Sequence, residues 1–300
     1  MDTLISAFRD YLTNQKSNSA NTIDSYLRDV SFFLEYLNKQ DIFSPNRATE
    51  TDIQNYVDHL RNLNKSATTI SRSLASIRCF YKFLIFTGNA NSNPAKGIKV
   101  EKSEKKLPQV LSGEEINVLL SQPRVTDAKG CRDKAMLELL YATGIRVSEL
   151  ISLNVGDINL QTGTLSCRGQ KGTRIIPVYP AAIVAVSDYI YRMRGLLTDQ
   201  NSGDSALFVN LNGSRLTRQG FWKIVKSYAV EAGITKEITP HTLRHSFAMH
   251  LLQNGASVKD IQAMMGHADI SSTQVYVQLL DLDNHMKSVY NDCHPRAKSS

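Results

Sequence analysis

Four histidines lie close together in this sequence, at positions His241, His245, His250 and His267. His241 and His245 stand one helical turn apart, a spacing at which zinc metalloproteases place two metal ligands. The glutamate that such a protease needs directly after the first histidine is replaced by Thr242, and Arg244 would repel a metal ion. The cluster therefore favours chemistry without a metal.

The same segment has the residue types of a phosphate-binding site. Arg244 follows His241 by three residues, so both project from one side of a helix that we expect to begin at Thr239, with Pro240 in its first position. A helix N-terminus already attracts anions through its free N–H groups and its dipole. Alone, either residue would indicate only a surface arginine or a capping histidine.

A second arginine comes from the string Y-A-T-G-I-R-V-S-E-L, residues 141–150. We expect one apolar helix to end at Gly144 and the next to carry Arg146 and Glu149. At a separation of three residues, Glu149 can hold the guanidinium of Arg146 in one orientation. Such pairs are common on helix surfaces, so this one indicates a site only together with other residues.

A candidate nucleophile follows in G-H-A-D-I-S-S-T-Q-V-Y, residues 266–276. We expect Ser271 or Ser272 to cap a helix that presents Tyr276 about one turn later. A phenol has an ordinary pKa of about 10 and needs cationic surroundings to react as a nucleophile at neutral pH. The arginines and histidines would supply these cationic surroundings. Taken by itself, Tyr276 could equally be a helix residue that only packs its ring.

These residues must be positioned by a mainly helical protein. Apolar residues recur at three and four positions within residues 22–37 and again within 70–84, which predicts two amphipathic helices in a first domain, residues 1–88. Residues 89–110 are polar, with two prolines and several lysines, and we expect them to link this domain to a second one, residues 111–300.

The second domain is predicted to be α-rich with one small antiparallel sheet. Ser112 and Glu115 have the spacing of a capping box, and Thr217 and Ser257 are further helix starts. Residues 164–168 and 173–178 are rich in β-branched side chains, so we expect a hairpin with Lys171 at its tip. The apolar pattern continues beyond Tyr276 and predicts a tail helix.

Composition limits the class of protein. The net charge of +7 permits a polyanionic partner without requiring one. The four cysteines are far apart, so we expect reduced thiols rather than a disulfide framework or a zinc site. No apolar segment is long enough to span a bilayer and the N-terminus lacks the pattern of a secretion signal, which predicts a cytoplasmic protein.

The ordered set of candidate residues is Arg146, Lys171, His241, Arg244, His267 and Tyr276. This order resembles the signature of the tyrosine site-specific recombinases, the phage integrase family. The strings S-A-N-T-I-D-S-Y-L-R-D and I-S-R-S-L-A-S-I-R-C-F-Y-K-F-L resemble the helical, SAM-like core-binding domain of that family. L-T-R-Q-G-F-W-K and H-P-R-A resemble its branch of bacterial chromosome-dimer resolvases.

The resemblance implies a reaction. Tyr276 would attack a DNA phosphodiester to leave a 3′-phosphotyrosyl bond and a free 5′-hydroxyl. Arg146 and Arg244 would bind the nonbridging oxygens, with Glu149 in support and His267 donating a further hydrogen bond. Lys171 is the candidate acid for the leaving oxygen and His241 the candidate base, although the residues alone leave these proton assignments open. No metal or nucleotide cofactor is implied.

The resemblance also implies partners. Double-stranded DNA with paired inverted-repeat sites would be bound by a homo- or hetero-tetramer with a related recombinase, with a DNA translocase as a regulator. Candidate DNA contacts are Arg72, Arg78, Lys82, Arg218, Gln219 and Lys223. The alternatives are an integrase or invertase of a mobile element, a type IB topoisomerase-like enzyme, and a DNA-binding regulator that performs no catalysis.

Overall fold

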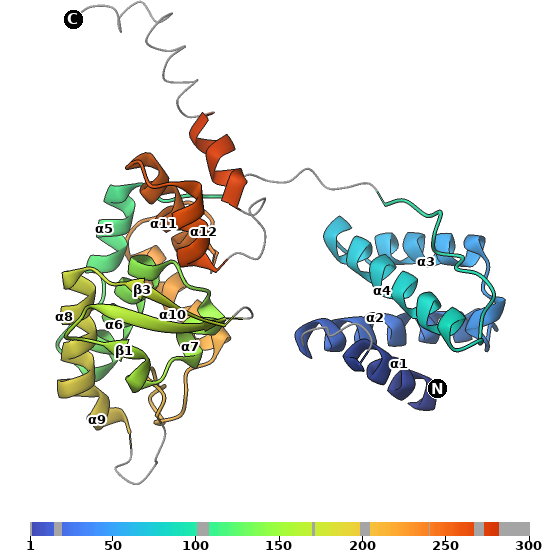
Figure 1. Cartoon of the computed structure of the whole chain (residues 1–300), viewed down its shortest axis with the longest axis horizontal. Coiled ribbons are helices and arrows are strands. Elements are labelled where there is room, and N and C mark those ends of the chain that lie inside the picture. The colour runs from blue at the N-terminus through green and yellow to red at the C-terminus, as the bar shows by residue number, and fades with distance from the viewer. Residues whose placement is uncertain are drawn as a thin grey trace, which may run out of the picture. The chain divides into compact units, whose positions relative to one another are not determined.

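The computed structural model describes residues 2–14, 20–100, 108–169, 172–198, 205–239, 241–266 and 273–281. The chain separates into two compact units, residues 1–105 and 106–300 (Figure 1). Helices dominate both, and the part of the chain described contains one small antiparallel sheet. The predicted fold class is therefore confirmed.

The first unit is a helical domain around one apolar core. Helix α2 turns Val30, Phe33 and Leu37 inward, as the periodicity predicts. Helix α4 begins where the hydroxyl of Ser66 accepts a hydrogen bond from the backbone N–H of Thr69. The elements are α1 (Asp2–Asn14), α2 (Ala20–Lys39), a short 3-10 helix η1 (Pro45–Arg47), α3 (Glu50–Asn62) and α4 (Ala67–Phe86).

Residues 89–100, in the segment expected to link the domains, pack on the first unit. Ala95 and Ile98 are buried in its core. The guanidinium of Arg78 donates hydrogen bonds to the carbonyls of Ala95, at 2.9 Å, and Ile98. The segment is polar in composition, but two apolar residues and one arginine are enough to attach it to α4.

The second unit contains the remaining helices and the sheet. Its helices are α5 (Gly113–Ser121), α6 (Ala128–Thr143), α7 (Val147–Ser152), η2 (Val155–Asp157), α8 (Pro180–Asp188), the π-helical turn η3 (Tyr189–Met193), α9 (Arg194–Leu197), α10 (Arg218–Glu231), α11 (Thr242–Gln253) and α12 (Val258–Met265). Residues 273–281 form a further helix. None of the helices described is long and apolar enough to cross a membrane.

The sheet has the strand order β1-β2-β3 among the described residues. Its strands are β1 (Ile158–Asn159), β2 (Thr164–Gly169) and β3 (Gly172–Pro177). The predicted hairpin is confirmed: β2 and β3 pair antiparallel, with Gly169 opposite Gly172. The tip residue Lys171 lies outside the described residues. Strand β3 packs against α6 and α12, so the hairpin is fixed to two helices of the second unit.

Local signals set most helix starts in this unit. Ser112 and Glu115 form the predicted capping box, and Thr217 caps α10. Helix α11 begins at Thr242 rather than near Thr239, because the hydroxyl of Thr242 accepts the Thr239 N–H in a preceding turn. Pro240, expected in the first helical position, lies outside the residues described.

Candidate active site

The corner between α6 and α7 positions Arg146. Helix α6 ends at Gly144 with φ +57°, and a Cβ there would meet a ring carbon of Phe247 at 2.2 Å, so only glycine fits. Arg146 then caps α7. Its backbone N–H donates to Glu149 Oε2 at 2.8 Å and its Nη1 to Glu149 Oε1 at 3.1 Å, the pairing that the spacing predicts.

Glu149 also binds a second arginine, Arg174 of β3. Arg174 Nη2 and Nη1 donate to the two carboxylate oxygens of Glu149 at 2.8 and 3.1 Å. Burial alone would raise the pKa of Glu149, but the hydrogen bonds from Arg174 and from the Arg146 backbone outweigh it and lower this pKa. Glu149 is therefore held as a carboxylate that orients two guanidinium groups.

Three arginines from different elements bind three successive carbonyl groups at the end of α12. Arg174 Nε donates to Met264 O at 2.8 Å, Arg244 Nη2 to Met265 O at 2.8 Å, and Arg146 Nη2 to Gly266 O at 3.1 Å. The C-terminus of a helix carries partial negative charge, which favours these contacts. Because adjacent residues lie about 3.8 Å apart along the backbone, the guanidinium groups of Arg146 and Arg244 converge at one place.

Gly266 permits this convergence. It has φ +63° and ends α12, and a Cβ on it would meet Arg174 Cζ at 2.9 Å. The next residue, His267, is predicted to donate a hydrogen bond to phosphate and lies outside the described residues.

Tyr276 reaches the same region from the helix at 273–281. Its ring is 2% exposed and packs with Phe247, Ile261 and Met265. Its phenol oxygen lies 2.7 Å from His245 Nδ1, and the rings of His245 and His241 are 6.1 Å apart. The nucleophile expected from the sequence is thus buried against α11 and α12.

Burial, and after it positive charge, governs the titration of this site. Burial, followed by the effects of His241 and Arg244, lowers the pKa of His245 to about 4. Burial and Arg244 likewise lower the pKa of His241, with smaller effects of Arg218 and Arg146. Burial raises the pKa of Tyr276 while Arg244 opposes it. The site therefore holds neutral histidines and a neutral phenol beside guanidinium groups that an anion would stabilise.

Arg244 is the most enclosed of these cations. It is 4% exposed and donates from Nη1 to Gly144 O as well as from Nη2 to Met265 O. Burial, and then the charge of Arg146, lower its pKa to about 10, which still leaves it a cation at neutral pH. The side chain of Arg146 is 39% exposed, so the two arginines present one accessible and one buried guanidinium.

The structure thus brings Arg146, Glu149, Arg244, His241 and Tyr276 together. Among the residues described, no group of three or more histidine, cysteine, aspartate or glutamate side chains is arranged to hold a metal ion.

The predicted DNA-contacting residues lie in different settings. Arg218, Gln219 and Lys223 are exposed in the first turns of α10, and the effect of Arg218 on His241 places it near the candidate site. In the first unit, Lys82 is exposed, and Arg72 pairs with the buried Asp29 at 2.9 Å while remaining 44% exposed.

Arg78, in contrast, is bound by the carbonyl groups of residues 95 and 98. A phosphate would have to compete with these internal acceptors, so the three basic residues of α4 are not equivalent.

Sequence reasoning missed two residues of the site, Arg174 and His245. The signal for Arg174 is its position in β3. Alternate residues of a strand share a face, so Arg174 lies on the same face as the buried Ile176, while Ile175 between them is exposed. His245 was considered only as a metal ligand, although its position one turn after His241 places it on the same face of α11.

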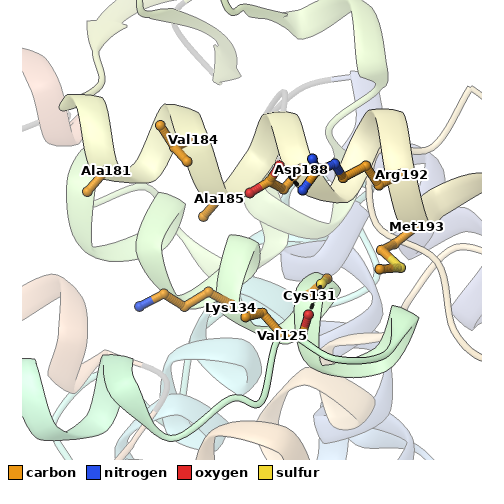
Figure 2. Close-up of a pocket in the computed structure, with 9 residues that line it drawn as sticks. All are labelled: Val125, Cys131, Lys134, Ala181, Val184, Ala185, Asp188, Arg192 and Met193. Atoms are coloured by element: carbon orange, nitrogen blue, oxygen red, sulfur yellow. Dashed lines mark hydrogen bonds and ion pairs between the residues drawn. The ribbon is translucent and has the colours of Figure 1, made fainter.

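A separate pocket lies between α6 and α8 (Figure 2). It is lined by Val125, Cys131, Lys134, Ala181, Val184, Ala185, Asp188, Arg192 and Met193. The thiol of Cys131 donates to Val125 O at 3.3 Å. The lining contains none of the predicted site residues, so this pocket is no part of the candidate active site.

Comparisons with known proteins show the family of this chain. The model of the phage integrase family matches residues 109–282, and that of the phage integrase N-terminal SAM-like domain matches residues 5–88. The chain is 46% identical to a protein named tyrosine recombinase XerD from Oceanobacillus iheyensis, over 98% of each sequence.

Solved structures of recombinases share the fold. XerA recombinase is 28% identical, with a TM-score of 0.54 over 98% of each chain. XerH site-specific recombinase, bound to a palindromic difH substrate in a post-cleavage complex, is 21% identical, with a TM-score of 0.75 over 89% of this chain and 79% of that one.

The chain therefore belongs to the phage integrase family, the tyrosine recombinases, which are enzymes that cut and rejoin DNA. The resemblance inferred from the sequence is confirmed, and the relatives support a XerD-like role in site-specific recombination.

Proposed function

We propose that this chain recombines DNA at specific sites through a covalent bond between Tyr276 and a 3′-phosphate. The observation that carries the proposal is the convergence of Tyr276 with Arg146 and Arg244, residues that are up to 130 positions apart in the sequence. Attack on a phosphodiester adds negative charge to its nonbridging oxygens, and guanidinium groups can bind that charge at two points each. Removing one such donor typically costs about 3–4 kcal/mol of transition-state stabilisation.

The carbonyl groups of Met265 and Gly266 occupy the positions at which a phosphate would compete for these arginines. Both are neutral acceptors, whereas a phosphodiester is an anion that binds guanidinium more strongly. Tyr276 is 2% exposed, so it can reach a phosphorus atom only after the groups that cover it shift. We expect DNA binding to drive that shift.

The remaining roles follow the resemblance. Lys171, at the tip of the hairpin, would protonate the leaving 5′-oxygen, and His267 would donate to the phosphate. His241 would serve as a base or proton carrier. Because the phosphotyrosyl bond conserves the energy of the phosphodiester, attack on it by another 5′-hydroxyl completes strand exchange without a metal ion or ATP.

The proposed biological role is XerD-like resolution of chromosome dimers through a Holliday junction. It is supported by the high identity to proteins named XerD over almost the whole chain. The partners would be double-stranded DNA with paired inverted-repeat sites and a XerC-like recombinase in a tetramer, with a DNA translocase as regulator. A mobile-element integrase is the alternative use of the same chemistry.

Exposed basic residues from both units would contact the DNA backbone. Arg218 of α10 lies near the site and would contact DNA beside the scissile phosphate, with the exposed Lys223 on the same helix. Arg72 and Lys82 of α4 would act in the first unit.

A nicked suicide substrate tests the proposal. The wild-type chain is expected to form a covalent adduct with DNA in EDTA, and Tyr276→Phe is expected to bind the same DNA without forming one. Tyr141→Phe is the matched control, since Tyr141 also bonds a histidine of α11 but at a different place. Adducts that persist in Tyr276→Phe would reassign the nucleophile.

The role is tested separately, with a XerC-like partner and a chromosomal terminus-type site. Holliday junctions that form only with both recombinases support the XerD-like role, whereas recombination by this chain alone at a mobile-element end supports the alternative.

A further inference from the structure

The phenol of Tyr276 has one hydrogen-bond partner in the part of the chain described, and that partner is His245. The two atoms, Tyr276 Oη and His245 Nδ1, lie 2.7 Å apart, and the ring centroids lie 5.7 Å apart. No described hydrogen bond joins the phenol to His241, which the resemblance suggests as its base. The contact involves the atom that would form the new bond to phosphorus.

A second histidine of α11 shows what this contact would be without catalysis. His250 Nδ1 lies 2.8 Å from the phenol oxygen of Tyr141 on α6, again as a Tyr–His hydrogen bond. The pKa of His250 is shifted by burial and a backbone hydrogen bond, with no arginine among the causes, whereas Arg244 lowers the pKa of His245. The difference between the two pairs is the surrounding charge.

The geometry points to His245 as the catalytic residue that takes the proton from Tyr276, an inference that rests on the proposed function. In this step the Tyr276 Oη–H bond breaks and its proton passes to His245 Nδ1, while Oη forms a bond to phosphorus. The bond from phosphorus to the 5′-oxygen breaks, and that oxygen receives a proton from Lys171. The reverse attack by a 5′-hydroxyl returns each proton.

The groups that face His245 explain when the step occurs. They are His241 and Arg244 from the start of the same helix, and Tyr276 from the helix at 273–281. Without DNA, burial and then the effects of His241 and Arg244 lower the pKa of His245 to about 4 and hold it neutral. Its Nδ1 is then hydrogen-bonded to the phenol without removing the proton.

A bound phosphodiester changes both partners. Its negative charge offsets that of the arginines, which makes His245 a stronger base. The phenol becomes more acidic as its oxygen bonds to phosphorus, so proton transfer accompanies attack. The nucleophile is therefore activated only when a phosphate is in place.

The test compares His245→Asn and His245→Leu with the wild type in single-turnover adduct formation on a suicide substrate from pH 6 to pH 10. Asn places an acceptor oxygen close to the position of Nδ1 but cannot take a proton, and Leu supplies neither. His250→Asn is the matched control and is expected to stay within twofold of the wild-type rate. DNA affinity and Trp222 fluorescence show that each variant binds and folds.

We expect His245→Asn to bind DNA normally and to form adduct at least about 100-fold more slowly at pH 7. Its rate should rise about tenfold per pH unit as free phenolate accumulates, whereas the wild-type rate should level off. Wild-type rates in His245→Asn would overturn the inference, because an acceptor alone would then suffice. The same pH-dependent loss in His241→Asn, but not in His245→Asn, would assign the proton to His241.

A more acidic nucleophile gives a second readout. In the wild-type chain, 3,5-difluorotyrosine at position 276 should remove the pH dependence of the adduct-forming rate. In the His245→Asn chain, the same replacement should restore the rate that this variant has lost. If that rate is not recovered, the inference is wrong. Failure of the wild-type chain to form any adduct would instead reject the proposed function.

Discussion

Replacing Arg174 by leucine should destabilise the second unit and disorganise the site. Arg174 connects the β2–β3 hairpin to Glu149, which orients Arg146, and to the carbonyl of Met264 at the end of α12. The leucine variant removes three hydrogen bonds from a charged donor, two of them to a carboxylate. Glu149 keeps its two hydrogen bonds to Arg146.

The magnitude follows from the burial of the pair. The side chains of Arg174 and Glu149 are 16% and 9% exposed. Breaking a buried ion pair by removing one partner costs about 3–5 kcal/mol. Because Glu149 keeps two hydrogen bonds to Arg146, we expect a loss at or just below the lower limit of this range, about 2–3 kcal/mol of unfolding free energy.

The sole tryptophan provides the assay. Trp222 lies in α10, so its fluorescence during urea unfolding reports on the second unit without separating the domains. With a slope of about 2 kcal/mol per molar urea, the expected loss lowers the midpoint by at least about 1 M. The fluorescence of Arg174→Lys, which keeps the charge but not the paired donors, should show an intermediate midpoint.

The effect should also depend on pH with a definite sign. The pKa of Glu149 in the folded chain is lower than its ordinary value of 4.5, so its stabilisation is fully present above that value. It is lost as the pH falls through the folded pKa. The difference between wild type and Arg174→Leu should therefore shrink in acid, and a difference that is below about 0.3 M urea at pH 7, or constant with pH, would refute this reasoning.

Three further results are expected. Gly266→Ala should lower the same urea midpoint by roughly 0.5–1 M. The backbone angle φ of +63° disfavours alanine, and the new Cβ would lie 2.9 Å from Arg174 Cζ. An unchanged midpoint would show that Arg174 moves aside freely. Ser112→Ala should remove the capping box of α5 and lower the free energy of unfolding by about 1 kcal/mol in the same assay. Ser121→Ala, at the other end of α5, is the control, and an equal loss there would argue against a cap effect. DNA affinity should fall steeply between 50 and 200 mM salt, with a shallower slope for Arg218→Ala, as measured by fluorescence anisotropy; an unchanged slope would remove Arg218 from the contact surface.

The helices could be predicted from sequence because their signals are local. The periodicity of α2, the capping box of α5 and the β-branched residues on both sides of the 169–172 turn each depend on a few neighbouring residues. The beginning of α11 differed because the side chain of Thr242 stabilises a turn before the helix, a contact that competes with simple capping.

The internal partners of the site could not be predicted in this way. The sequence indicated Arg146 and Arg244 as anion-binding residues, but their acceptors in this structure are carbonyl groups of α12, which no side-chain pattern encodes. Likewise, the roles of Arg174 and His245 depend on how β3 and the helix at 273–281 pack against α7 and α11. Residues 89–100 look like a linker in composition because the contribution of Ala95 and Ile98 to a core is apparent only after folding.

The most direct test of the account is to identify the residue that becomes joined to DNA. The adduct that the wild-type chain forms on a nicked duplex would be digested with protease and nuclease, and the modified peptide sequenced by mass spectrometry. The account predicts a nucleotide attached through its 3′-phosphate to Tyr276, out of twelve tyrosines, with a free 5′-hydroxyl on the other DNA end. Attachment at another residue, or through a 5′-phosphate, would contradict it.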